Sequence, residues 1–281
     1  MYKRQALGEP ISSLAWEGPA EQLDLTINAQ PALLAASIAA QRALEATLDG
    51  TSSRFGPPSY FAGHSMGQYS AMVAAGVLGL ADAVQLVRER GRLMQATSGD
   101  GAMAAIIGLA DERNDDLIAA GAAAGIITIA NRNSPGQVVI SGERAAVEAA
   151  TEAAKGLGAR RAKVLPVSVA AHSPLMTEAA EGMRQALADI AFANPAAPLL
   201  ANADAIVLSD GEACRDELID HLTRGVDWVT AVETMAAAGT DTFVEVGPGK
   251  VLTGLVRRID KDATTVAIDD ITTEGGLELP A

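Results

Sequence analysis

A serine flanked by glycines is the residue in this sequence best suited to nucleophilic chemistry. Residues 63–67 read GHSMG, between an apolar and aromatic run at 60–62 and small or apolar residues at 69–75. A G-x-S-x-G motif between a strand and a helix is typical of a nucleophile elbow, a sharp turn that exposes the serine. Glycines leave room for such a turn, and backbone N–H groups at the start of a helix stabilise developing negative charge. The motif predicts that Ser65 is a nucleophile.

A histidine is the expected general base for this serine. The chain has three, His64, His172 and His221, and His64 belongs to the motif itself. Imidazole titrates near neutral pH, so it can take a hydroxyl proton and later return it. An isolated His172 would be explained as a polar residue at a strand end, but beside an elbow it is predicted to be the base. No triad acid is evident, because Asp115 and Glu152 fall on the polar faces of predicted helices; a carbonyl group could orient the imidazole instead.

An arginine lies on an apolar helix stripe. Residues 80–97 are predicted to form a helix, with these apolar positions spaced by three and four: Ala83, Leu86, Val87, Leu93 and Met94. Arg90 lies on the same stripe. A buried arginine needs an anionic partner. From the spacing alone, an internal salt bridge explains Arg90 best.

Composition and charge narrow the class of protein. The 281 residues are 49% hydrophobic but only 3% aromatic, and the net charge of −14 leaves no basic stripe for nucleic acid. No apolar run reaches the roughly 18–20 residues needed to cross a bilayer, and no signal peptide is evident. The single cysteine, Cys214, cannot form an internal disulfide or a metal cluster. We therefore expect a cytoplasmic α/β protein that binds no metal, cofactor, membrane or nucleic acid.

Two parts are predicted along the chain. Residues 98–169 contain a strand, a helix, two strands, a helix and a strand, the β-α-β-β-α-β order of a ferredoxin-like unit. Residues 1–97 and 170–281 are expected to form one larger α/β domain into which this unit is inserted. Its expected helices lie within 19–49, with Pro31 in a first turn, and at 213–223 and 228–238; its expected strands lie at 198–202 and 242–246. The basic residues 1–5 precede no strand, so we expect a truncated or fused N-terminus in which they are foreign to the fold.

Several segments together resemble one family. They are GHSMGQYSA (63–71), VRERGRLMQ (87–95), GAMAAIIGL (101–109), NSPGQVVISG (133–142), PVSVAAHSPLM (166–176), HLTRGVDW (221–228) and VEVGPGKVLTGL (244–255). In this order they resemble the malonyl-CoA:acyl-carrier-protein transacylase family, which is related to the acyltransferase domains of fatty-acid and polyketide synthases. The resemblance runs from about residue 6 to about residue 260. It implies an α/β-hydrolase-like large domain with a parallel sheet and a nucleophile elbow, together with a ferredoxin-like subdomain.

The resemblance also implies a mechanism. Ser65, activated by His172, would attack the thioester of malonyl-CoA and form a malonyl-serine ester. The phosphopantetheine thiol of acyl carrier protein would then take the malonyl group, in a ping-pong scheme. The N–H of Met66 would be an oxyanion donor, and Arg90 would hold the malonyl carboxylate by a bidentate contact.

Further residues take roles from the same resemblance. Gln30, His64 and Asn133 would line the substrate site. The backbone carbonyl of His221 would orient the catalytic histidine, at a position where glutamine or asparagine is usual. A carbonyl acceptor survives that change of side chain.

This sequence departs from the family in three places. The opening strand and its G-Q-G-S-Q loop, whose first glutamine supplies the second oxyanion N–H, are missing. Gln68 stands where glutamate is common. Ala171 matches neither of the residues usual at its position, which leaves malonyl or methylmalonyl preference open.

Two other functions remain as alternatives. One is a serine hydrolase or thioesterase that uses the same elbow; the other is an N-terminally truncated, inactive fragment of a transacylase. A simple esterase has no need of a buried Arg90. For the transacylase we expect a monomer that binds malonyl-CoA and docks acyl carrier protein through a local basic patch. The candidates for that patch are Arg160, Arg161, Lys163, Lys250, Arg257 and Arg258.

Overall fold

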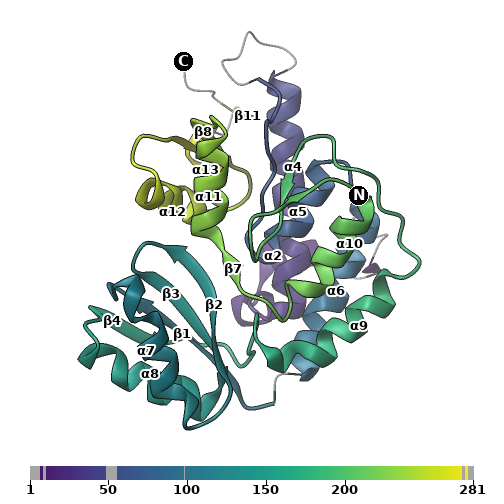
Figure 1. The fold of residues 1–281 in the computed structure, drawn as a ribbon. Helices are drawn as coiled ribbons and strands as arrows, with labels where there is room; N and C mark the ends of the chain where they lie inside the picture. Colours follow the sequence, from purple (N-terminus) through teal and green to yellow (C-terminus); the bar gives the residue numbers. More distant parts are fainter. Residues whose placement is uncertain (1–6, 9–10, 49–55, 98, 274–275, 278–281) are drawn as a thin grey trace.

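The computed structural model describes residues 7–8, 11–48, 56–97, 99–273 and 276–277. It is a mixed α/β structure in which a five-stranded sheet lies beside a larger, mainly helical part (Figure 1). The predicted foreign residues 1–5 lie outside the described residues. None of the helices in the described ranges is long and apolar enough to cross a bilayer.

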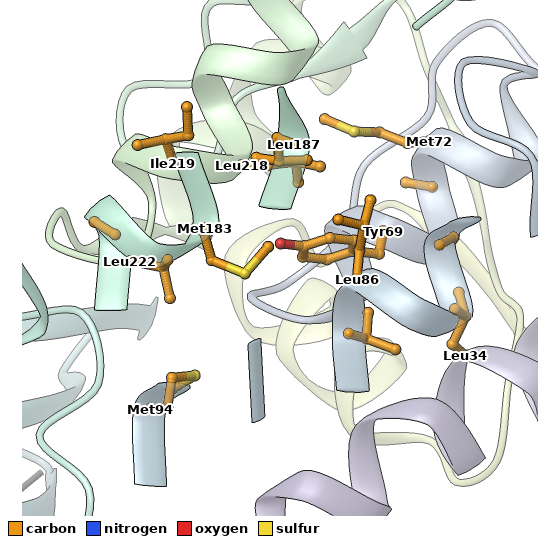
Figure 2. Packing of buried hydrophobic residues seen from close by; sticks show 14 of the residues in the cluster. Leu34, Tyr69, Met72, Leu86, Met94, Met183, Leu187, Leu218, Ile219 and Leu222 are labelled. Atoms are coloured by element: carbon orange, nitrogen blue, oxygen red, sulfur yellow. The ribbon is translucent and has the colours of Figure 1, made fainter. Parts of the chain in front are cut away.

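Helices dominate the larger part of the molecule. They are α2 (Ile11–Glu17), α3 (Ala20–Leu23), α4 (Thr26–Leu48), α5 (Gly67–Ala74), α6 (Leu80–Thr97), α9 (Thr177–Leu187), α10 (Gly211–Asp220), α11 (Trp228–Ala237), α12 (Val251–Ile259) and α13 (Ile268–Ile271). Figure 2 shows side chains of α4, α5, α6, α9 and α10 meeting in one apolar core around the buried ring of Tyr69. The predicted helix over 80–97 is confirmed by α6, and its apolar stripe is the face that enters this core.

The start of α4 differs from the expectation. The helix begins at Thr26, so Pro31 lies inside it rather than in its first turn. Proline has no N–H to give to the carbonyl four residues earlier. That carbonyl, on Ile27, instead accepts a 2.9 Å hydrogen bond from Nη1 of Arg88 on α6. The long-range bond replaces the helical one and ties α4 to α6.

The smaller part is an antiparallel sheet with its own apolar core. Its strands are β1 (Gly101–Ile107), β2 (Ile127–Ser134), β3 (Gln137–Glu143) and β4 (Arg161–Val164). The sheet order is β4-β1-β3-β2, and α7 (Asn114–Ala122) and α8 (Arg144–Gly156) pack against it (Figure 1). The predicted order of elements is present, and the last strand, β4, ends at Val164, five residues before the predicted end of the unit. A fifth strand, β7 (Val226–Asp227), comes from the larger part and pairs in parallel with β2.

Strands in the larger part are short. They are β5 (Leu199–Leu200), β6 (Val207–Leu208), β8 (Thr242–Glu245), β9 (Thr264–Ala267), β10 (Thr272–Thr273) and β11 (Gly276–Leu277). Parallel pairing in the described residues of this part is limited to β8 with β9 and a single bridge between Phe61 and Leu199. Prolines at 57, 58, 195 and 198 precede the bridged residues and cannot donate to a ladder. Among the described residues of the larger part, the parallel sheet that the resemblance implies is thus present only as these short pairings.

Candidate active site

The turn that carries Ser65 is tightly closed. Ser65 has φ 53°, a left-handed conformation that is uncommon for a residue with a side chain. A Cβ on Gly63 would lie 2.2 Å from the carbonyl carbon of Gly67, whereas a Cβ on Gly67 would meet no atom within 4 Å. The close approach therefore requires glycine only at the first of the two positions. Helix α5 begins at Gly67, directly after the turn.

Ser65 and His172 are in hydrogen-bond contact. The Oγ of Ser65 lies 2.7 Å from Nε2 of His172. The other ring nitrogen, Nδ1, lies 2.6 Å from the carbonyl oxygen of His221 and 3.1 Å from that of Arg224. Because carbonyl oxygens only accept, Nδ1 carries the proton and Nε2 accepts from the serine hydroxyl. The structure thus brings together the three residues that the sequence assigns to nucleophile, base and orienting carbonyl.

Burial keeps this imidazole neutral. His172 is 3% exposed, and burial, together with the charge of Arg90, lowers the pKa of His172 to about 3. Hydrogen bonding of Nδ1 to the His221 and Arg224 carbonyls opposes this shift in pKa only in part. A neutral ring with a free lone pair on Nε2 is the form that a general base requires.

Arg90 lies deep in the site, with no acidic partner among the residues that the structure describes. Its side chain is 2% exposed, and its Nη1 donates to Oε1 of Gln30 at 2.8 Å. Its Nη2 donates to Oγ of Ser65 at 3.2 Å. Within the described residues it forms no ion pair, so the internal salt bridge favoured by the helix pattern is not found there. A buried cation directed at a nucleophile is a ready site for a substrate anion.

His64 and Asn133 connect the elbow to the smaller part. Oδ1 of Asn133, on β2, lies 2.8 Å from Nε2 of His64. An amide oxygen only accepts, so this ring nitrogen carries a proton. The centre of the Trp228 ring lies 5.7 Å from that of the His64 ring. The candidate site therefore lies at the junction of the two parts of the molecule.

Sequence reasoning missed two residues behind the elbow. Asn202 accepts from the N–H of Ser65 at 2.8 Å and donates to the carbonyl of Gly63 at 3.0 Å. The N–H of Asn202 in turn donates to Oε1 of Glu217, on α10, at 2.7 Å. The two contacts of Asn202 to the elbow join residues more than a hundred positions apart, and Glu217 lies 15 positions from Asn202, so no local spacing signals them. The only sequence signal is an asparagine at the end of a predicted strand.

The remaining predicted residues lie as follows. Met66 is the N-cap of α5, and its N–H makes no hydrogen bond within the part of the chain that the structure describes. Gln68 is fully buried and donates to the carbonyl of Leu200 at 2.8 Å. Asp115 and Glu152 are exposed on α7 and α8, outside the site. No group of three or more His, Cys, Asp or Glu side chains among the described residues is placed to hold a metal ion.

Comparison with known proteins identifies the family. The pattern of the acyl transferase domain matches residues 5–272. The malonyl CoA-acyl carrier protein transacylase of Escherichia coli K12 is 46% identical over 267 residues, which are 94% of this chain and 84% of the relative. This chain belongs to the malonyl CoA-acyl carrier protein transacylase family. The Bacillus subtilis transacylase is 41% identical over 95% of this chain and 83% of its own length.

Solved structures of family members share the fold. The acyl carrier protein S-malonyltransferase of Vibrio cholerae superposes with a TM-score of 0.89 at 43% identity, over 95% of this chain and 86% of that one. A malonyl-transacylase solved in complex with its type II PKS acyl-carrier protein superposes with a TM-score of 0.90 at 41% identity, over 95% of this chain and 85% of that one. The family fold is therefore a mixed α/β structure, as observed.

Proposed function

We propose that this protein transfers a malonyl group from malonyl-CoA to the phosphopantetheine thiol of acyl carrier protein, in fatty-acid or polyketide synthesis. The observation that carries the proposal is Arg90, a buried cation whose Nη2 contacts the nucleophile Ser65. Family relatives named as malonyl transacylases support it, as does the relative solved with an acyl-carrier protein.

The first half of the reaction loads the serine. His172 Nε2 takes the hydroxyl proton of Ser65 as Oγ bonds to the thioester carbonyl carbon. The carbon–sulfur bond then breaks, and His172 gives the proton to the departing CoA sulfur. The product is a malonyl ester on Ser65 and free CoA thiol.

The second half reverses these steps with a different thiol. His172 takes the proton of the carrier-protein thiol, and the sulfur attacks the ester carbonyl. The bond to Oγ breaks, and the proton returns to Ser65. The same base serves both halves because Nδ1 stays bonded to the His221 carbonyl throughout.

Arg90 would select the acyl group. Arginine has five N–H donors, and the contacts of Arg90 to Gln30 and Ser65 leave donors for a carboxylate. An acetyl group would leave the buried guanidinium without an anion. Carboxylate binding would also offset the positive charge that lowers the pKa of His172, so the pKa rises and the base strengthens when the correct substrate arrives.

The oxyanion and the rest of the pocket are assigned by position. The N–H of Met66 at the start of α5 is the proposed oxyanion donor, because the N–H of Ser65 is already bonded to Asn202. Gln30 would hold Arg90 in place, while His64 would line the site from the elbow and Asn133 from the small sheet.

The finer architecture and cellular setting are part of the same proposal. Residues 98–169 are assigned to a ferredoxin-like subdomain, on the basis of the sheet order β4-β1-β3-β2. Residues 1–97 and 170–281 are assigned to an α/β-hydrolase-like domain, on the basis of the elbow. The enzyme is proposed to be a cytoplasmic monomer.

Initial-rate kinetics test this function against hydrolysis. Malonyl-CoA is varied at several concentrations of holo-acyl carrier protein, and malonyl-carrier protein, free CoA and malonate are quantified. A transacylase gives parallel double-reciprocal lines and carrier-bound malonyl equal to the CoA released. Release of malonate at the same rate with or without carrier protein would instead establish a thioesterase, and no turnover by folded protein would establish the inactive alternative.

A further inference from the structure

A buried carboxylate lies behind the nucleophile and is not used by the mechanism above. Glu217 is 6% exposed and its Oε1 accepts from the N–H of Asn202, whereas Nδ1 of His172 contacts the backbone carbonyls of His221 and Arg224. It is therefore not the acid of a conventional triad. Its contact to Asn202 links it to the turn that carries Ser65.

Asn202 holds that turn on both sides of residue 64. Its Oδ1 accepts from the N–H of Ser65, and its Nδ2 donates to the carbonyl of Gly63. Ser65 is held at φ 53°, a left-handed conformation that is unfavourable for a residue with a side chain. Two hydrogen bonds from a side chain that is itself 4% exposed are suited to fix such a turn.

Helix α10 connects the nucleophile to the base. The carbonyl of Glu217 is bonded to both the N–H and Nδ1 of His221 at the C-terminal end of the helix. The carbonyl of His221 then orients His172. One turn of helix thus fixes the serine through Asn202 and the histidine through a backbone carbonyl.

We propose that Glu217 and Asn202 are positioning residues, which hold Ser65 in the conformation that His172 can activate. This inference rests on the proposed function only in taking Ser65 as the nucleophile. The carboxylate of Glu217 anchors Asn202, and the amide of Asn202 anchors the elbow. Neither side chain contacts the substrate.

The pair should make the reactivity of Ser65 depend on pH near neutrality. Burial raises the pKa of Glu217 to about 7, with a further rise from Asp204, against the hydrogen bonds from Asn202 and the charge of Arg224. The other titratable groups facing it are Tyr69 and Cys214. A carboxylate accepts a stronger hydrogen bond than a carboxylic acid does, so the elbow is held best above this pKa. His172, with its pKa lowered to about 3, would not produce a step in this range.

The test measures the rate at which phenylmethanesulfonyl fluoride modifies Ser65 between pH 5 and 9, as a function of reagent concentration. Rates are normalised to the final extent of labelling, so that unfolded protein does not contribute. We expect the wild-type rate to rise through a step near pH 7. Glu217→Gln keeps a neutral acceptor for the Asn202 N–H at every pH, so it should lose the step and react throughout at a rate close to the low-pH rate of wild type. The matched control is Asp216→Asn, which changes an exposed carboxyl on the same helix and should keep the pH step.

Two further variants separate positioning from stability. Glu217→Leu and Asn202→Ala remove the contacts, and each should lower the normalised rate roughly 100-fold, the effect of misplacing a reacting group by about 1 Å. A purely structural role would lower the melting temperature and leave the normalised rate unchanged, and that result would overturn the proposal. So would a pH step that survives in Glu217→Gln. If wild-type protein reacts with the sulfonyl fluoride but not with malonyl-CoA, the proposed function fails while this inference stands.

Discussion

Replacement of Arg90 by alanine should remove selectivity for a carboxylated acyl group. The side chain is 2% exposed and donates to Gln30 and Ser65. A hydrogen bond to a charged group is worth about 1.5–3 kcal/mol, so a bidentate contact to malonyl carboxylate is worth at least about 3 kcal/mol. That free energy corresponds to a loss of roughly 100-fold in kcat/KM for malonyl-CoA.

The reaction of acetyl-CoA provides the internal comparison. Acetyl-CoA has no carboxylate, so its kcat/KM should not fall in Arg90→Ala, and it should rise as the unpaired buried charge is removed. Both substrates are measured by acylation of Ser65 in quenched single-turnover reactions, with folded protein verified by thermal melting. Arg92→Ala is the matched control, because Arg92 is exposed on the same helix and pairs only with Glu89 among the described residues. An equal fall in both rates would refute the selectivity argument and assign Arg90 a role in activating the serine.

Three further predictions concern the turn and the buried titratable groups. Gly63→Ala should abolish labelling of Ser65 by a sulfonyl fluoride, because the new Cβ would lie 2.2 Å from the carbonyl carbon of Gly67. Gly67→Ala should leave Ser65 reactive, because its Cβ would meet no atom within 4 Å. Equal labelling of both variants would contradict the geometry. Burial lowers the pKa of His64, His172 and His221, so in acid the unfolded chain binds more protons than the folded one. The contribution of these three residues to the free energy of unfolding should therefore be fully present above about pH 6.5 and be lost towards pH 3. Urea titrations at stepped pH should show this loss, and it should be shallower in His221→Gln. The pKa of Glu217 is raised instead, so the folded state keeps the proton of this carboxyl to a higher pH than the unfolded chain does, and the contribution of Glu217 to stability falls as the pH rises from about 4.5 to about 7. In the same titrations the free energy of unfolding of Glu217→Gln should gain on the order of 3 kcal/mol relative to wild type across this range. A difference between the two proteins that does not change with pH would show that Glu217 ionises as it does in water.

Local patterns in the sequence predict the parts of the site that lie on single elements. The apolar spacing of residues 80–97 places Arg90 on the buried face of α6, and the structure has it there. The GHSMG motif predicts a sharp turn before a helix, and the turn at Ser65 is followed directly by α5. In both cases the residue pattern that makes the prediction lies within one short stretch of the sequence.

Most contacts between distant segments required the family resemblance or the structure. The elbow and the chemistry of histidine predicted the pairing of Ser65 with His172 across 107 positions, but only the resemblance assigned the His221 carbonyl to the imidazole. The salt bridge expected for Arg90 was wrong for the described residues because its buried partner is the neutral side chain of Gln30. Periodicity reports that a face is buried but not which group it meets.

Polar networks and short strands were the least predictable features. Asn202 and Glu217 are single polar residues with no motif, and their importance comes from bonds to Ser65 and Gly63. The apolar runs at 198–202 and 242–246 predicted two strands, and the structure has a two-residue strand, β5, in the first and a four-residue strand, β8, in the second. Apolar character alone does not distinguish a ladder strand from an extended buried segment.

The central claim is that Ser65 stores a malonyl group between two thiols. Its most direct test is peptide mapping after acid quench of enzyme mixed with malonyl-CoA, before and after a chase with holo-acyl carrier protein. We predict one malonyl ester per chain on the peptide that contains Ser65, its transfer to carrier protein during the chase, and its absence from Ser65→Ala. A malonyl group on any other residue, or carrier protein loaded equally well by Ser65→Ala, would contradict the account.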